Sequence, residues 1–393
     1  MTGSAARFRT QLRSVKSWKN AERQGDERVS ERRDVVVVGA GVHGLCAAFA
    51  LRRRGLRVLV VDRFEAGHDY GGSHGAGRIT RSSYHDRRYV EMTRRMHREA
   101  WPTLESELGV RLVHPTPGLF YGPERGPFAA FLDATLAAGV DVEELPRAEA
   151  AARFPMLRFD PGDRVMLDHT AGVLAADRTL ASLRAWLTAN DVELRHGVRV
   201  TSVARRRDAV TLAATCGDLQ AAHVVLATGA WLGELLPAWR TRLTPLRQEV
   251  GYVDVDAAPA DLAAGRFPVW CRVGGPDDAF DYGLPVFDRP GLKVAQHRTH
   301  GAPDDVEDAG APVDEAALLA RARRRLTLPV RGLHGVETCL YAVAENERLH
   351  VTTHPDDPRV VAVAACSGHG FKFGPVLAEQ VADLVQRNDG SRR

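Results

Sequence analysis

Two short apolar runs stand near the start of the chain, with a glycine-rich turn and a stretch of helical length between them. Val35–Val38 and Val58–Val61 contain only valine and leucine. Continuous apolar runs of this length are typical of strands that are buried on both faces of a parallel sheet. With residues 45–54 as a helix between them, the order strand, turn, helix, strand predicts the opening unit of an α/β fold.

The turn after the first run carries glycines at positions 39, 41 and 44. Gly39 permits a tight turn, Gly41 lets the backbone approach a pyrophosphate, and Gly44 lets the helix pack close to the sheet. Asp62 ends the second run, 18 residues after Gly44, where a carboxylate can bond an adenosine ribose hydroxyl. The pattern predicts a dinucleotide site. It does not choose between FAD and NAD, because both present the same ADP half to such a turn.

Strands of the same buried kind recur far along the chain, at Val224–Leu226 and Val360–Ala364. The segments 110–165 and 240–335 have a different pattern, with alternating strands and a helical stretch at Glu315–Arg325. We therefore expect two interleaved, discontinuous domains with the ligand at their junction.

Length, composition and charge narrow the class of protein. The 393 residues suffice for two domains, the apolar and charged fractions of 44% and 26% are ordinary for a globular protein, and no apolar run reaches the roughly 18 residues that span a bilayer. A formal net charge of +3 gives no reason to expect nucleic acid or a membrane as partner.

Residues 1–32 are polar and basic, and we expect a disordered tail, with a basic, partner-binding amphipathic helix as the alternative.

Cysteine and lysine usage adds two further points. The five cysteines are scattered and odd in number, which argues against a disulfide framework or a zinc site and favours a reducing cytoplasm; we expect no metal. Among 53 lysines and arginines only four are lysines, and Lys293 and Lys372 are the two outside the tail. A lysine in a chain that otherwise uses arginine can have a function that requires a compact ammonium whose pKa the protein can change. The alternative is that the two lysines occur there by chance. The cysteines are Cys46, Cys216, Cys271, Cys339 and Cys366.

Four stretches resemble the D-amino-acid-oxidase-like flavoproteins, and most closely their branch of monomeric sarcosine oxidase and N-methyltryptophan oxidase. They are, in order, the glycine turn, GSHGAGRITR at 72–81, YGLP at 282–285 leading to GLKVAQH at 291–297, and CLY at 339–341 followed by SGHGFKF at 367–373. The resemblance covers residues 33–388. It implies FAD as cofactor and a Rossmann-type FAD-binding domain (33–110, 166–238 and 336–388) interleaved with a mixed antiparallel-sheet α+β substrate domain (111–165 and 239–335).

The resemblance implies that the flavin is covalently bound. In the sarcosine oxidase branch, a cysteine followed two positions later by a tyrosine carries the flavin as an 8α-S-cysteinyl thioether, and Cys339 and Tyr341 match this pair. A thiolate close to the 8α-methyl group is the chemical requirement. A small buried core cysteine is the alternative, and we keep that interpretation for the other four cysteines. The segment after Tyr341 lacks the proline and aspartate that the branch has there.

Four further residues match positions that handle charge in the branch. Arg81 and Lys372 match the pair that holds the substrate carboxylate, where a guanidinium offers a two-pronged fork and an ammonium adds a point charge. Arg78 matches an arginine close to the flavin, and His74 belongs to the same loop. The resemblance therefore implies an amino-acid substrate, whereas a solvated surface side chain is the alternative for any single arginine.

Lys293 stands on an expected strand between Leu292 and Val294, so alternation places it on the same side as His297. A solvated strand face is one interpretation. In the branch, a lysine here bonds through water to flavin N5 and activates dioxygen, while residues that match Tyr282 and His297 line the substrate cavity. We assign Tyr341 to substrate binding as well. To FAD we assign Gly39, Gly41, Gly44, Asp62, Arg63, Gly72, Ser73, Cys339, Gly368, Gly370 and Lys372.

The implied activity is oxidation of the C–N bond of a secondary amine or a cyclic or modified amino acid to an imine, with O2 reduced to H2O2. Between Arg81 and Tyr89 the chain is one residue short and lacks the Gly-Glu-Gly of the sarcosine cavity, which argues against sarcosine itself. A flavoprotein dehydrogenase or specialised-metabolism tailoring oxidase with another electron acceptor is the alternative, and a flavin-free nicotinamide dehydrogenase is a second. We expect a small amino acid and O2 as partners, and a cytoplasmic monomer or small homo-oligomer.

Overall fold

The computed structural model describes residues 33–274, 280–298, 301, 303–306 and 312–390. The expected disordered tail, residues 1–32, lies outside the described residues. Among the described residues no helix is long and apolar enough to cross a membrane.

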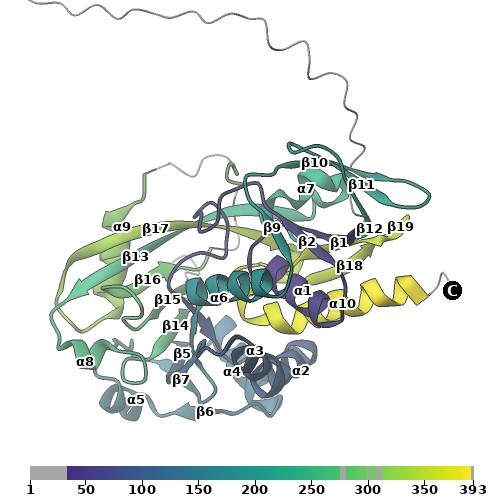
Figure 1. Ribbon diagram of the computed structural model, residues 1–393. Coiled ribbons are helices and arrows are strands. Elements are labelled where there is room, and N and C mark those ends of the chain that lie inside the picture. The colour runs from purple at the N-terminus through teal and green to yellow at the C-terminus, as the bar shows by residue number, and fades with distance from the viewer. Residues whose placement is uncertain (1–32, 275–279, 299–300, 302, 307–311, 391–393) are drawn as a thin grey trace, which may run out of the picture. The chain divides into compact units, whose positions relative to one another are not determined.

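A parallel sheet forms around the two N-terminal apolar runs. β1 (Arg33–Val38) lies parallel between β2 (Val58–Val61) and β12 (Leu219–Leu226), and the strands predicted at Val224–Leu226 and Val360–Ala364 are confirmed. Antiparallel strands extend this eight-stranded sheet (Figure 1). Its remaining strands are β9 (Glu193–Arg195), β10 (Val200–Arg205), β11 (Val210–Ala214), β18 (His350–His354) and β19 (Asp357–Ala364).

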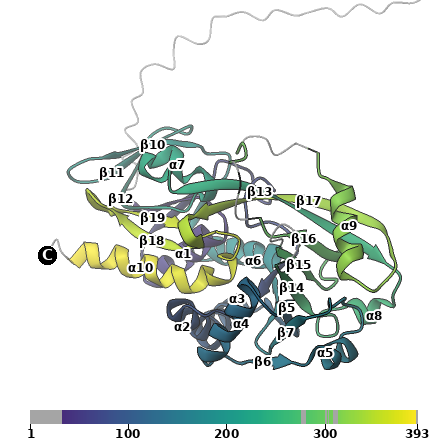
Figure 2. The ribbon, with the colours of Figure 1, turned by 180° about the vertical axis from the view of Figure 1, so that it is seen from behind.

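Both faces of this sheet are covered, as its continuous apolar runs predict. Val35 and Val37 pack into one apolar cluster with helices α1 (Val42–Arg53), α6 (Ala176–Ala189) and α10 (Gly374–Gly390). Val36 and Val38 belong to a second cluster on the other face, formed with β10, β11 and α7 (Leu232–Leu235). Figure 2 shows α1 and α10 together beside the sheet. This packing fixes the start of α1 against the end of β1.

A second eight-stranded sheet has the order β17-β13-β16-β15-β14-β5-β7-β6, in which only β14 and β5 run parallel. Helix α9 (Glu315–Arg325) covers β13, β16 and β17, and its bounds match the predicted helical stretch. The strands are β5 (Gly118–Pro123), β6 (Val142–Leu145), β7 (Asp163–Asp168), β13 (Leu243–Val255), β14 (Val269–Val273), β15 (Phe280–Leu284), β16 (Leu292–Gln296) and β17 (Val330–Ala344).

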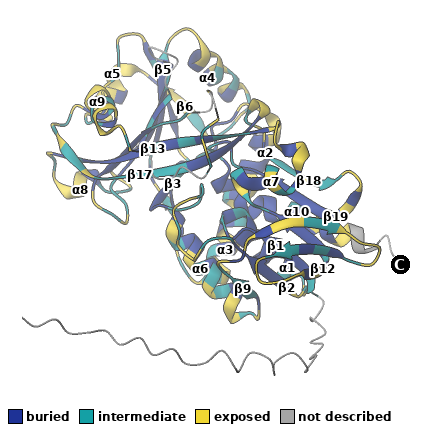
Figure 3. Ribbon diagram, turned by 90° about the horizontal axis from the view of Figure 1, so that it is seen from above, coloured by how far each residue is buried: buried dark blue, intermediate teal, exposed yellow. Residues whose placement is uncertain are grey.

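A small antiparallel sheet of three strands, in the order β3-β8-β4, brings the segment after the glycine turn next to α6. Helices with exposed outer faces, such as α5, α8 and α9, lie on the outside (Figure 3). The elements not yet named are β3 (Gly77–Thr80), β4 (Val113–Pro115), β8 (Gly172–Ala175), α2 (Arg87–Arg95), α3 (Trp101–Leu108), α4 (Pro127–Ala137), α5 (Arg147–Arg153) and α8 (Pro259–Leu262).

The predicted α/β class, a Rossmann-type parallel sheet joined to a mixed, mainly antiparallel sheet, is confirmed. Strands of each sheet come from separate stretches of the chain, so the two sheets are interleaved in sequence. The domain boundaries themselves stay a prediction, and the one at residue 336 falls inside β17.

Candidate functional site

Two adjoining cavities lie between the sheets. The first cavity, of about 500 Å³, is lined by the glycine turn and the end of β2, and the second, of about 360 Å³, by residues of β3, β15, β16 and β17. Gly72, Cys366 and Phe371 line both, which places the cavities side by side. Together they offer an elongated site with one end on the parallel sheet and the other on the mixed sheet.

The glycine turn is shaped by contacts that leave no space for side chains. Gly39 has a φ of 104°, and a Cβ added there would lie 2.4 Å from the carbonyl oxygen of Ala227. A Cβ on Gly44 would lie 1.8 Å from the carbonyl oxygen of Gly39, and one on Gly41 would lie 3.0 Å from Ser73 Oγ. Because nothing larger than glycine fits, the N-terminal end of α1 stays open toward the first cavity.

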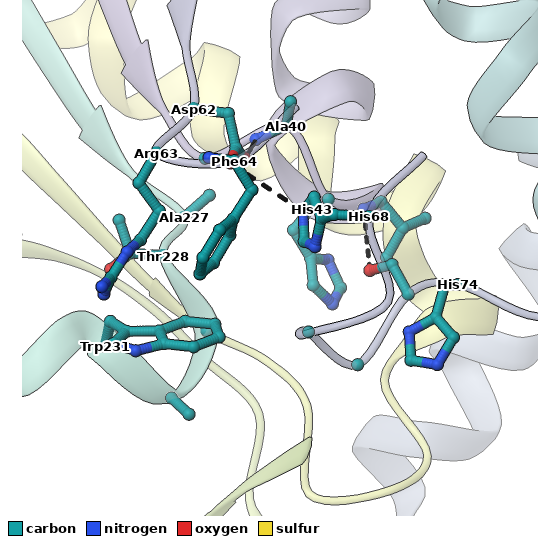
Figure 4. Close-up of a pocket in the computed structure, with 18 of the residues that line it drawn as sticks. Ala40, His43, Asp62, Arg63, Phe64, His68, His74, Ala227, Thr228 and Trp231 are labelled. Atoms are coloured by element: carbon teal, nitrogen blue, oxygen red, sulfur yellow. Dashed lines mark hydrogen bonds and ion pairs between the residues drawn. The ribbon is translucent and has the colours of Figure 1, made fainter. Parts of the chain in front are cut away.

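Asp62 directly follows β2 and is almost fully buried in the wall of the first cavity. Its Oδ2 accepts a hydrogen bond from the Ala40 amide at 2.6 Å, and its Oδ1 accepts one from the Phe64 amide at 2.9 Å (Figure 4). Asp62 thus holds the glycine turn as well as offering a carboxylate to the cavity. Ser73 Oγ accepts from the Val42 amide at 3.1 Å, which ties the second glycine stretch to the first turn of α1.

An aromatic wall next to Asp62 was not predicted from the sequence. The Arg63 guanidinium lies 4.9 Å from the ring centroid of Phe64 and 5.2 Å from that of Trp231, and the two rings are 5.5 Å apart (Figure 4). Trp231 comes from a different part of the chain, so no local pattern pairs it with Phe64. A glycine cradle at a helix N-terminus, a carboxylate and flat apolar walls together suit a dinucleotide such as FAD.

In the second cavity, Arg81 and Lys372 meet at Tyr84, a residue that the sequence analysis did not assign. The Arg81 guanidinium lies 4.1 Å from the Tyr84 ring centroid and hydrogen-bonds Ser83, while Lys372 Nζ donates to Tyr84 Oη at 3.2 Å and to the His369 carbonyl at 2.8 Å. Burial, followed by the charge of Arg81, holds the pKa of Lys372 well below its usual value. In the described part of the chain no carboxylate lies within 4 Å of either cation.

A chain of hydrogen bonds that runs in one direction holds the Lys372 side chain in place. Burial and the nearby Lys372 charge lower the pKa of His369 to about 3, so its imidazole is neutral at pH 7. His369 Nε2 lies 2.9 Å from the Glu347 carbonyl, which can only accept, so Nε2 carries the proton and Nδ1 accepts from Tyr84 Oη at 3.1 Å. The order Lys372, Tyr84, His369, Glu347 therefore runs from donor to acceptor.

Lys293 and Arg78 form a second cationic pair in the same cavity. Lys293 on β16 is 6% exposed, and its Nζ donates to the Gly77 carbonyl at 3.2 Å. Arg78 donates to the carbonyls of Gly72, at 3.1 Å, and His74, and so cross-links its own loop. Burial and the Arg78 charge lower the pKa of Lys293 to about 7. The strand alternation expected for Lys293 places it in the cavity with His297.

Cys339 on β17 lines the second cavity, and Cys366 lies close enough to share an apolar cluster with it. Burial raises the pKa of the Cys339 thiol, whereas the charges of Arg78 and Lys293 lower it. Cys339 thus borders the cavity, where two cations partly offset the effect of burial on its thiol.

Tyr282, His297 and Tyr341 line the second cavity as expected, and burial raises the pKa of Tyr282 and of Tyr341. Gly368 has a φ of 70°, and a Cβ there would lie 2.4 Å from atoms of both His297 and Tyr341. Gly368 is therefore needed for these two rings to approach each other.

The other predicted residues divide between the cavities. Arg63, Gly72, Ser73 and His74 line the first, while Gly370 and Lys372 line the second. His74 was grouped with Lys293 as a catalytic residue, but it lines the first cavity, where its Nε2 lies 2.8 Å from the Thr338 carbonyl. His74 thus lines the other cavity, although its carbonyl accepts a hydrogen bond from Arg78, and its catalytic role stays a prediction.

Comparisons with known proteins agree with this geometry. The family model described as FAD dependent oxidoreductase matches residues 34–384. The peroxisomal sarcosine oxidase of Mus musculus is 31% identical, with 90% of this chain and 92% of the relative covered, and the monomeric sarcosine oxidase of Arthrobacter sp. (strain TE1826) is 30% identical with the same coverage. The solved structure of NikD, an unusual amino acid oxidase essential for nikkomycin biosynthesis, superposes with a TM-score of 0.78 at 26% identity, covering 91% of this chain and 94% of that one. The resemblance drawn from the sequence is confirmed.

Proposed function

Because the chain belongs to the family of FAD-dependent oxidoreductases, we propose that it oxidises the C–N bond of a carboxylate-bearing secondary or cyclic amine to an imine, with O2 as the electron acceptor and H2O2 as product. Two relatives named as sarcosine oxidases and a structural neighbour named as an amino acid oxidase support this class of donor.

One observation carries the proposal: Arg81 and Lys372 are cations on the wall of one cavity, both in contact with Tyr84. Two like charges held together away from bulk water favour an anion between them. A substrate carboxylate suits this role, because the guanidinium supplies a planar pair of donors and the ammonium a point charge. Tyr84 and His369 orient the Lys372 ammonium for it.

The glycine turn, Asp62 and Ser73 would hold FAD in the first cavity, and the bound flavin would supply the redox chemistry of the reaction. The chain's own residues supply position and charge. Arg81 and Lys372 bind the carboxylate and so orient the amine. Lys293, in its protonated form, supplies a positive charge where negative charge develops on dioxygen, and Arg78 adds a second one nearby. Tyr282, Tyr341 and Phe280 exclude water from this space.

We also propose that Cys339 carries FAD as a thioether. The thiol lines the second cavity together with Arg78 and Lys293, whose charges partly offset the burial that raises its pKa. In the described part of the chain all five cysteines are unpaired, in keeping with a reducing cytoplasm as the place of action.

The substrate is proposed to be larger than sarcosine. The segment after Arg81, which lacks the Gly-Glu-Gly of the sarcosine cavity, brings Tyr84, His85 and Asp86 to the cavity wall, where Phe131 from α4 joins them. Aromatic walls around a volume of about 360 Å³ suit a ring or a bulky substituent on the amine.

A peroxide-coupled screen of N-methyl and cyclic amino acids tests the proposal, with each compound paired with its decarboxylated analogue. We expect peroxide from at least one cyclic or N-methyl amino acid and little from its analogue. Equal rates for the two members of each pair would contradict the carboxylate site. Flavin reduction without peroxide on exposure to air would instead indicate a dehydrogenase that uses another acceptor.

A further inference from the structure

Glu337 is a carboxylate on β17, two residues before Cys339, that the proposed reaction does not use. Tyr252 Oη donates to Glu337 Oε2 at 2.7 Å, and Arg289 forms an ion pair with Oε1. The Arg289 guanidinium in turn lies 3.6 Å from the Tyr252 ring centroid. The three side chains therefore hold one another, and the carboxylate is fixed from two directions.

The triad of Tyr252, Glu337 and Arg289 adjoins the cationic pair of Lys293 and Arg78. Tyr252 on β13 is the cross-strand partner of Lys293 on β16. On the other side, a Cβ on Gly75 would lie 3.1 Å from Glu337 Oε2 and 3.4 Å from Arg78 Nη1, so the carboxylate and the guanidinium approach the same glycine. Glu337 also lines the first cavity.

The charged groups around Lys293 have opposite effects on its pKa. The ammonium is destabilised by burial and by the cations Arg78 and Arg289, whereas negative charge on Cys339 or Glu337 favours its charged form. Burial raises the pKa of the Cys339 thiol and of the phenols of Tyr252 and Tyr282, so these three groups are uncharged near neutral pH. Among the groups that act most strongly on Lys293, Glu337 is therefore the one that carries a negative charge.

We propose that Glu337, held by Tyr252 and Arg289, is a positioning residue that keeps the Lys293 ammonium charged. The inference concerns the charge state of Lys293, and its consequence for oxygen reduction rests on the function proposed above. A residue at this position can tune the reaction without touching substrate, because its charge acts on Lys293 in the cavity wall.

The test is competitive labelling of Lys293 with acetic anhydride over a range of pH in the flavin-loaded protein, read by mass spectrometry of the peptide. The reagent attacks only the uncharged amine, so the midpoint of labelling reports the pKa of Lys293. In E337Q, which keeps the shape but removes the charge, we expect the midpoint to fall by roughly one pH unit. E337D, which withdraws the charge by one methylene, should show a smaller shift in the same direction and covers the case in which E337Q does not fold.

Glu249 offers a matched control, since it is a carboxylate on the neighbouring strand β13 that pairs with Arg247 at 3.0 Å and is not among the groups that act most strongly on Lys293. E249Q should label as the wild type does. An unchanged midpoint in folded E337Q and E337D would overturn the inference. Reoxidation of the flavin, followed in parallel, separates the two proposals: a shifted midpoint with an unchanged pH profile of reoxidation would leave the role of Glu337 standing and contradict the role of Lys293 in oxygen reduction.

Discussion

The Arg81 guanidinium and the Lys372 ammonium meet at one aromatic side chain. Arg81 lies 4.1 Å from the ring centroid of Tyr84, and Lys372 donates to the hydroxyl of the same residue at 3.2 Å. Both cations face a cavity of about 360 Å³, and the repulsion between them is relieved when an anion binds. This arrangement explains why a carboxylate is expected on the substrate and not merely an amine.

Replacing Arg81 by alanine is expected to weaken substrate binding by roughly 10- to 100-fold, because loss of one charged hydrogen-bond partner costs about 1.5 to 3 kcal/mol. Steady-state kinetics with the best amino acid would show the loss chiefly in KM. Arg87→Ala, which removes an exposed arginine on α2, is the control and should leave KM unchanged. The same KM in Arg81→Ala as in the wild type would rule out the carboxylate clamp.

Cys339→Ser is expected to release FAD on acid precipitation while the native protein still binds it, because the glycine turn and Asp62 remain. The colour of pellet and supernatant after precipitation is the measurement: yellow stays with the wild-type pellet and moves to the supernatant for the variant. Cys366→Ser, which changes the neighbouring thiol, should behave like the wild type. Free flavin from the wild-type protein would show that the attachment does not exist.

Lys293→Met is expected to slow reoxidation of reduced flavin by two to three orders of magnitude, since loss of one preorganised charge costs roughly 3 to 4 kcal/mol of transition-state stabilisation. Reduction by substrate should change far less. Stopped-flow measurements of the two half-reactions separate these effects. Lys293→Arg should restore little, because the broad guanidinium does not replace a compact ammonium. If Lys293→Met reoxidises at the wild-type rate, Lys293 is an ordinary strand residue.

Protonation of His43 is expected to destabilise the protein in acid. Its Nε2 donates to the Ala365 carbonyl at 2.7 Å, and burial lowers its pKa to about 4. Since the unfolded chain binds this proton with a pKa near 6.5, the unfolded state takes up more protons as the pH falls from about 6.5 toward 4, and stability is lost over that window. The melting temperature should therefore drop less between pH 7 and pH 5 in His43→Asn than in the wild type or in His169→Asn, an exposed control. Identical pH dependence in all three would contradict this account.

The sequence predicted those parts of the fold that local patterns determine. The valine runs predicted β1 and β2 because buried parallel strands are apolar throughout. Helix α9 begins where Asp314 caps it by accepting a hydrogen bond from the Ala317 amide at 2.9 Å. The resemblance brought Arg81, Lys293, Tyr282 and Lys372 to one cavity wall, as the structure has them.

What the sequence did not predict depends on contacts between distant segments. Tyr84 lies in the shortened segment after Arg81, but its pairing with His369 joins residues 285 positions apart. From the sequence, Glu337 is an ordinary strand carboxylate. Its hydrogen bond with Tyr252, 85 positions away, forms because the fold brings β13 beside β17. His74 shares a loop with Arg78, yet it lines the first cavity and Arg78 the second, which no spacing in the sequence reveals.

The most direct test of the account is a single cycle of reduction and reoxidation. The purified yellow protein is mixed anaerobically with one equivalent per flavin of its best cyclic or N-methyl amino acid, the flavin absorbance is followed, and air is then admitted while peroxide is measured. The account predicts bleaching by the amino acid but not by its decarboxylated analogue, followed by return of the colour and about one peroxide per flavin. Flavin that stays oxidised with every carboxylate-bearing amine, or that stays reduced in air, would contradict it.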